Sequence, residues 1–160
     1  MTRVRALGLL ILAASLSAAC GSKPGGSYVG QAQLHIKSYE TGSYAASDEA
    51  AERVVATLAG KSASEFYLSF DEKSPLRCRL LVVNKNLEDN DTGNDKELEV
   101  RLPGAVQRCD VKDKSGKVQS AKIIDMVGGA GDQASNFLIR LEAEGGSGTM
   151  YEFSYRGNRQ

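Results

Sequence analysis

Histidine and tryptophan are scarce in this sequence, whose 160 residues contain one histidine and no tryptophan. A serine hydrolase needs a base beside its nucleophile and a third group that orients the base. The one histidine, His35, falls on the polar side of an alternating segment, where we expect it to be solvent-exposed. Residues 145–148, Gly-Gly-Ser-Gly, do not form a G-x-S-x-G nucleophile elbow. We therefore expect no enzymatic activity, no catalytic residues and no cofactor.

An excess of positive charge is also missing. Basic and acidic residues number 20 each, and the formal net charge is zero. Without residues 1–19, 18 basic residues stand against 20 acidic ones, a net charge of −2. Proteins that bind nucleic acids need a basic surface for the phosphates, so we expect no nucleic-acid partner.

The uncharged segment near the N-terminus is short for a transmembrane helix. Residues 6–19 number 14 and would form about 21 Å of helix, whereas a bilayer requires about 20 residues. Arg3 and Arg5 precede this segment, and small residues end it. The arrangement predicts a signal peptide over residues 1–19.

Leu16-Ser17-Ala18-Ala19-Cys20 resembles the lipobox of bacterial lipoproteins, with Ser17 where leucine is usual. The resemblance implies cleavage before Cys20, a lipid on that cysteine and anchoring in a membrane. Gly21 then favours the outer membrane, with the domain facing the periplasm or the exterior. Residues 20–27 would form the lipidated cysteine and a flexible tether. Ordinary secretion stays open, because Ser17-Ala18-Ala19 also fits a small-x-small cleavage site, as does a retained N-terminal helix.

Three cysteines are present, Cys20, Cys78 and Cys109. An odd thiol in an exported protein needs an explanation, and lipidation of Cys20 would leave the other two free to pair. A disulfide between Cys78 and Cys109 would close the loop between them and stabilise the fold by roughly 3–4 kcal/mol in the chain-entropy model. Two buried free thiols are the alternative.

Alternation of apolar and polar residues dominates the rest of the chain and predicts β-strands. Seven segments show it, and glycine-containing turns, among them 103–104, 114–116, 128–131 and 145–148, separate several of them. The alternating segments are 32–37, 66–70, 76–82, 97–102, 117–126, 137–141 and 151–155. We predict a single all-β domain over residues 28–157, an antiparallel sandwich or up-and-down barrel of about eight strands.

Residues 47–60 fit two structures. Ser47 could be the N-cap of a short helix near 48–59, with Gly60 as its end. The same segment could be a strand, because Val54, Ala56 and Leu58 alternate with other residues. The sequence leaves both possibilities open.

An acidic segment contains Asp89, Asp91 and Asp95 around Gly93. Closely spaced oxygen ligands on a loop are what calcium requires. However, an EF-hand has glycine at its sixth position, and Gly93 would be the fifth. A solvated loop is therefore the favoured interpretation, and these three residues are only a weak calcium candidate.

Two functions fit these features. The first is a non-enzymatic, membrane-anchored binding or assembly module that contacts another envelope protein through a strand edge or a face. The second is a small-ligand carrier, since the domain faintly resembles lipocalin-like barrels, although Tyr28-Val29-Gly30 stands where those proteins have Gly-x-Trp. Large apolar residues such as Leu34 and Phe66 could equally fill the barrel.

Overall fold

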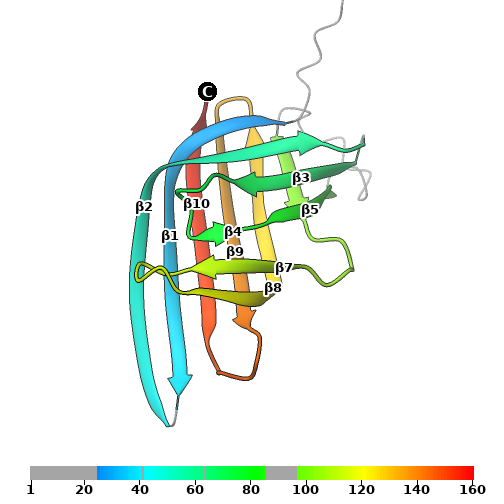
Figure 1. Cartoon of the computed structure of the whole chain (residues 1–160). Coiled ribbons are helices and arrows are strands. Elements are labelled where there is room, and N and C mark those ends of the chain that lie inside the picture. Colours follow the sequence, from blue (N-terminus) through cyan, green and yellow to red (C-terminus); the bar gives the residue numbers. More distant parts are fainter. Residues whose placement is uncertain (1–24, 41, 63, 86–96) are drawn as a thin grey trace, which may run out of the picture.

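The computed structural model describes residues 25–40, 42–62, 64–85 and 97–160, which form β-strands and the loops that connect them (Figure 1). No helix in these ranges is long and apolar enough to cross a membrane. Ten strands follow one another in the described part of the chain. They are β1 (Gly26–Glu40), β2 (Ser43–Gly60), β3 (Glu65–Phe70), β4 (Leu76–Arg77), β5 (Arg79–Asn84), β6 (Glu97–Arg101), β7 (Arg108–Lys112), β8 (Val118–Gly131), β9 (Ala134–Ala143) and β10 (Met150–Arg159).

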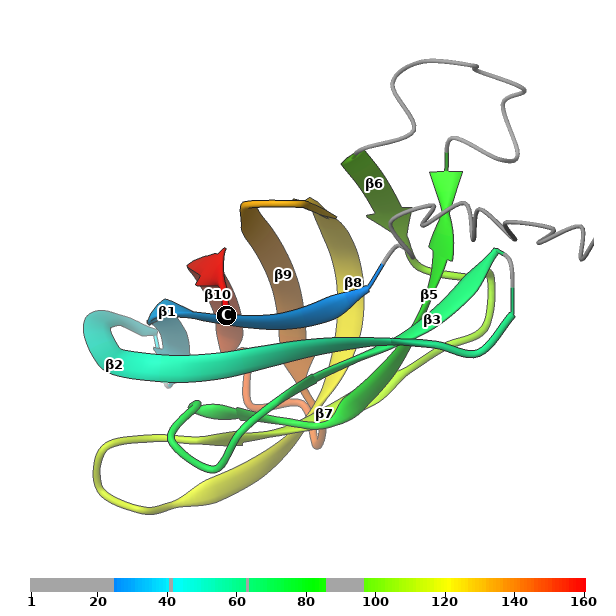
Figure 2. The same cartoon turned by 90° about the horizontal axis from the view of Figure 1, so that it is seen from above.

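The strands form one antiparallel sheet with the order β4-β7-β8-β6-β5-β3-β2-β1-β10-β9. An additional pairing of β8 with β9 joins eight of them into a ring, seen from above in Figure 2. The ring is not quite a barrel, because β5 and β6 share only two residue pairs, and β7 and β4 branch from β8. The prediction of an all-β antiparallel domain with about eight strands is confirmed.

Residues 48–59 are strand, so the helical alternative is wrong. They belong to β2, which pairs with β1 from Gly26↔Leu58 to Glu40↔Ser43. Val54, Ala56 and Leu58 all face the core. The neighbouring strands thus override the local helical pattern, as burial against a sheet commonly does.

Residues 128–131, Gly-Gly-Ala-Gly, were expected to form a turn, and they instead complete β8. The missing side chains of Gly128 and Gly129 allow two neighbouring strands to approach. A Cβ on Gly128 would lie 2.3 Å from the carbonyl oxygen of Asn136, and one on Gly129 would lie 2.8 Å from that of Leu98. Glycine here serves close strand packing. The turn expected at 114–116 is confirmed, with the Gly116 amide bonding the Asp113 carbonyl at 2.9 Å.

Large side chains fill the interior of the ring. The partly buried Phe70 ring packs against this core and has centroid distances of 4.9 Å to Phe153, 5.5 Å to Tyr155 and 6.4 Å to Phe137. Leu34 and Phe66 are also buried. These large apolar residues, which could have lined a ligand cavity, thus pack against one another in the core.

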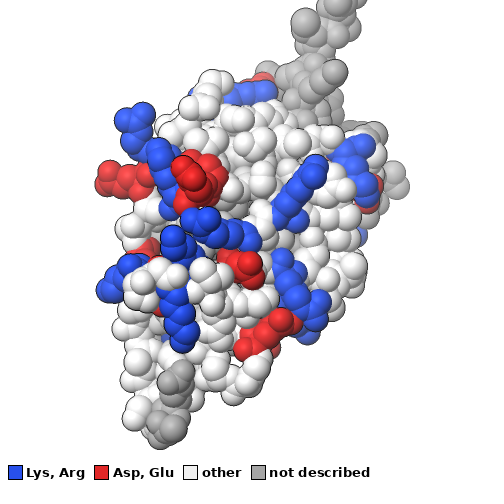
Figure 3. All heavy atoms as spheres, in the orientation of Figure 1, with Lys and Arg blue, Asp and Glu red and all other residues white. Residues whose placement is uncertain are grey.

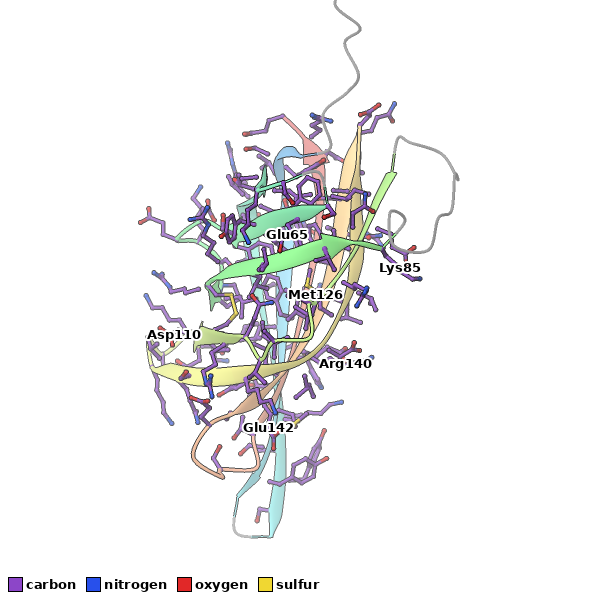
Figure 4. The ribbon with its side chains drawn as sticks, turned by 90° about the vertical axis from the view of Figure 1, so that its right-hand side faces the viewer. Glu65, Lys85, Asp110, Met126, Arg140 and Glu142 are labelled. Carbon is purple, nitrogen blue, oxygen red and sulfur yellow. A yellow bond between two sulfur atoms is a disulfide. The ribbon has the colours of Figure 1, made fainter. Side chains whose placement is uncertain are left out.

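Cys78 and Cys109 form a disulfide, as predicted, with 4.9 Å between their Cα atoms. Cys78 lies between β4 and β5, and Cys109 lies on β7. The bond, drawn in yellow in Figure 4, fastens the branch formed by β4 and β7 to the strands of the ring.

Candidate binding surface at the edge of β2

The lower half of β2 has a partner on one side only. Ala56, Thr57 and Leu58 pair with both β1 and β3, whereas Ser43–Glu52 pair with β1 alone among the described residues. In Figure 1 this half runs with β1 into a hairpin that extends below the other strands. An unpaired strand edge exposes main-chain groups that can bond another chain.

The alternation along β1 identifies which β2 groups face the free side. The Gln160 amide donates to the Ser27 carbonyl oxygen at 3.0 Å, on the β10 side of β1. Even-numbered residues of β1 therefore direct their main-chain groups to β2. Leu34 is one of these and lies opposite Glu49. The main-chain N–H and C=O groups of Glu49 therefore face β1. Its neighbours on β2, residues 48 and 50, direct their N–H and C=O groups to the free side.

A β-bulge separates the paired and unpaired halves of β2. Gly30 lies opposite Val54 and Gln31 opposite Glu52, which leaves Arg53 as an extra residue. Arg53 has a φ of 56°, and no other non-glycine residue in the described part of the chain has a positive φ. A bulge bends its strand and increases the local twist. It therefore marks the point below which β2 has no second partner.

The free edge of β2 forms one wall of a groove of about 450 Å³. The other wall consists of the segment from β3 to β4 and the turn from β7 to β8. The lining residues are Asp48, Glu49, Ala50 and Ala51 on β2, and Glu72, Lys73, Ser74, Pro75, Arg77, Lys112, Asp113 and Lys114 opposite. We call this feature the edge groove.

The two walls differ in charge. The β2 wall carries the acidic residues Asp48 and Glu49, while the opposite wall carries one arginine and three lysines. That wall also has two acidic residues, Glu72 and Asp113, and the Asp113 carboxylate accepts a hydrogen bond from the Ser115 hydroxyl at 2.5 Å. This bond lowers the pKa of Asp113. Charges of both signs are also mixed over the face shown in Figure 3.

His35, expected to be solvent-exposed, is half-buried, and its Nδ1 lies 2.5 Å from an Asp48 carboxylate oxygen. It belongs to a row of directly opposed side chains that crosses five strands. The row is Asp48 (β2), His35 (β1), Glu152 (β10), Arg140 (β9) and Asp125 (β8). Arg140 bonds both Glu152, at 3.1 Å, and Asp125, at 3.3 Å; its position on β9 is labelled in Figure 4. Sequence alone misses this row because it depends on the register of four strand pairs.

The remaining predicted sites lie outside the described residues. These are Cys20 and the calcium candidates Asp89, Asp91 and Asp95. Within the described ranges, no three His, Cys, Asp or Glu residues gather into a possible metal site. Lipidation of Cys20 and calcium binding by the three aspartates therefore stay predictions.

A second exposed feature lies at the tip of the β1–β2 hairpin. Tyr39 and Tyr44 are opposite each other, and their ring centroids are 5.2 Å apart. Each side chain is more than half exposed. Tyrosine is enriched in protein interfaces because it combines an apolar ring with a hydrogen-bonding group. The free edge of β2 thus ends at an exposed aromatic pair.

No protein-family model and no curated protein matches the sequence. Among solved structures, the chain is similar to a Bacteroides fragilis protein provisionally described as an outer membrane protein, with 9% identity and a TM-score of 0.48 over 84% of this chain and 50% of that one. It thus spans about half the length of that protein. It is also similar to the YwiB protein of Bacillus subtilis, with 10% identity and a TM-score of 0.32 over 82% of this chain and 92% of that one. Both similarities are distant.

Proposed function

We propose that this protein is a non-enzymatic binding module of the bacterial cell envelope, anchored by a lipid on Cys20. It holds an extended segment of a partner envelope protein along the free edge of β2. The unpaired edge of Ser43–Arg53 is the observation that carries this proposal. Addition of a strand to such an edge is a common mode of peptide recognition, because main-chain hydrogen bonds supply the affinity.

The side chains along this edge suit an incoming strand. Alanine occupies positions 45, 46, 50 and 51, and serine occupies 43 and 47. Small side chains leave room for the side chains of an added strand. The Tyr39–Tyr44 pair would lie beside one end of that strand.

The position of the edge also supports a partner away from the anchoring membrane. The six residue-to-residue steps from Cys20 to Gly26 span at most about 20 Å. The 15 residues of β1, by contrast, extend over roughly 50 Å. The described chain begins near the C-terminus, and the hairpin tip lies at the opposite end (Figure 1). The edge of β2 would therefore extend away from the anchored end.

A proline substitution on the edge tests this proposal. Ala50→Pro removes an N–H that faces the free side and leaves the hydrogen bonds to β1 intact, so the fold should survive. Ala105→Pro, at an exposed loop position between β6 and β7, is the matched control. Each protein is extracted from its own membrane in mild detergent and weighed by native mass spectrometry.

We expect a protein partner on the wild type and on Ala105→Pro, and its loss from Ala50→Pro. Equal partner binding by all three proteins would show that the edge is not the binding site. A bare mass for all three would contradict the binding function itself, and a small-molecule adduct would favour a carrier.

A further inference from the structure

We infer that the edge groove selects its partner by charge, and that the inserted strand carries an arginine or lysine directly opposite Glu49. This inference rests on the proposed function. It names the chemistry of the partner segment and the residue that recognises it.

Glu49 points into the groove. It lies opposite Leu34, whose side chain is fully buried on the inner face, and two residues from Ala51, which lies opposite buried Ala32. Side chains alternate along a strand, so Glu49 shares this inner face. It is half-buried and lines the groove. Asp48, its neighbour, points to the outer face, where it contacts His35.

The Glu49 carboxylate has no partner. Among the described residues, no hydrogen bond or ion pair reaches it. The cations of the opposite wall, Lys73, Arg77, Lys112 and Lys114, form no ion pair with it either. Within the described structure, the negative charge of Glu49 therefore has no ion-pair partner on the inner face.

An inserted strand would complete the burial of this carboxylate. Burial of an unpaired charge is strongly unfavourable, whereas a hydrogen-bonded ion pair offsets much of that cost. A neutral side chain opposite Glu49 would leave the charge uncompensated, and an acidic one would add repulsion. Only a basic residue at this position supplies both the countercharge and hydrogen-bond donors, with arginine able to bond both carboxylate oxygens.

A second copy of this chain does not fit the edge. Antiparallel pairing of two β2 edges would bring Asp48, Glu49 and Glu52 close to the same residues of the other copy. Like charges on paired strands are destabilising. The acidic edge therefore disfavours self-association and leaves a basic segment of another protein as the occupant.

Selection from a displayed library of short random segments tests the inference with the full-length protein in detergent. The targets are the wild type, Glu49→Lys, Glu49→Gln and Ala50→Pro. Glu142→Lys on β9, an exposed outer-face position, makes the same charge change away from the groove. Thermal melting verifies that each variant is folded before selection.

We expect segments selected by the wild type to carry Arg or Lys at one fixed position among apolar residues. They should bind Glu49→Gln roughly tenfold or more weakly, the loss expected for one charge-assisted bond, and Glu142→Lys unchanged. Glu49→Lys should instead select Asp or Glu at the same position.

The outcomes separate this inference from the proposed function. Segments that lose binding to Ala50→Pro but are indifferent to the charge at position 49 would overturn the role of Glu49 and leave strand addition standing. Segments that bind Ala50→Pro as well as the wild type would overturn the edge groove as the site. Failure to select any segment would contradict both.

Discussion

The Tyr155 hydroxyl donates a hydrogen bond to the main-chain carbonyl oxygen of Tyr28, at 2.7 Å across 127 residues of sequence. A weaker contact of 3.3 Å reaches the carbonyl oxygen of Val54, beside the bulge in β2. The hydroxyl thus lies where β1, β2 and β10 meet. A Cβ on Gly157 would come within 2.2 Å of it, so the absence of a side chain at position 157 makes room for this bond.

Replacement of Tyr155 by phenylalanine should destabilise the fold by about 1–3 kcal/mol, because two buried carbonyl oxygens lose their donor. Urea unfolding followed by circular dichroism measures the change. Tyr67→Phe is the control, since no hydrogen bond of the Tyr67 hydroxyl is found within the described structure. Equal stability of the two variants would contradict the structural role of the Tyr155 hydroxyl.

Alkaline pH should unfold the protein through the same residue. Burial raises the pKa of Tyr155 to about 12 from its ordinary value of 10.0, and burial also raises the pKa of Tyr28 and of Tyr151. Between these two values the unfolded chain releases the Tyr155 proton and the folded chain keeps it. Stability is therefore unaffected by this group below pH 10 and falls as the pH rises from 10 towards 12.

Ultraviolet absorbance of phenolate measures this titration. We expect the buried tyrosines to ionise only at higher pH or together with unfolding. Ionisation of all six tyrosines near pH 10 in a protein that still shows native circular dichroism would contradict the prediction.

Replacement of Arg53 by glycine should stabilise the protein by about 1 kcal/mol. Arg53 has a left-handed backbone conformation, which is strained for a residue with a Cβ atom and unstrained for glycine. Arg53→Ala removes the same side chain and keeps the strain, so its stability should stay close to that of the wild type. If both variants changed stability equally, the effect would come from the arginine side chain and not from the backbone.

Replacement of Cys20 by serine should release the protein from the membrane fraction. The serine hydroxyl cannot receive the thioether-linked lipid that the lipobox resemblance implies, and stable anchoring needs acyl chains. Cell fractionation with a high-salt wash, followed by blotting, measures the distribution. Retention of Cys20→Ser in the washed membranes would contradict lipidation at this residue.

Much of the strand content could be predicted because alternation is a local property of the sequence. Leu98 and Val100 on β6, for example, are buried as their pattern indicates. The exceptions share one cause. Residues 128–131, Gly-Gly-Ala-Gly, look like a turn until the close approach of β6 and β9 to β8 is known. Residues 48–59 fit a helix as well as a strand until β1 is known to lie beside them. In both places the deciding contacts come from distant parts of the chain.

The edge groove could not be predicted from the sequence for the same reason. Its existence depends on the extra residue Arg53 and on the point at which β3 stops following β2. Glu49 appears in the sequence as an ordinary surface residue. Only the register with Leu34 places its carboxylate on the inner face, without a partner.

The first and last of the described strands close the ring, because β1 pairs with β10 from Tyr28↔Arg159 to Lys37↔Met150. A ribosome or export channel that delivers the chain from its N-terminus releases β1 early, whereas β10 comes last. Until β10 emerges, β1 has only β2 as a neighbour, and its other side is open to mispairing. Native closure therefore waits for delivery of β10, and such distant pairings fold slowly. A chaperone that shields β1 during that interval would protect the newly delivered chain from aggregation.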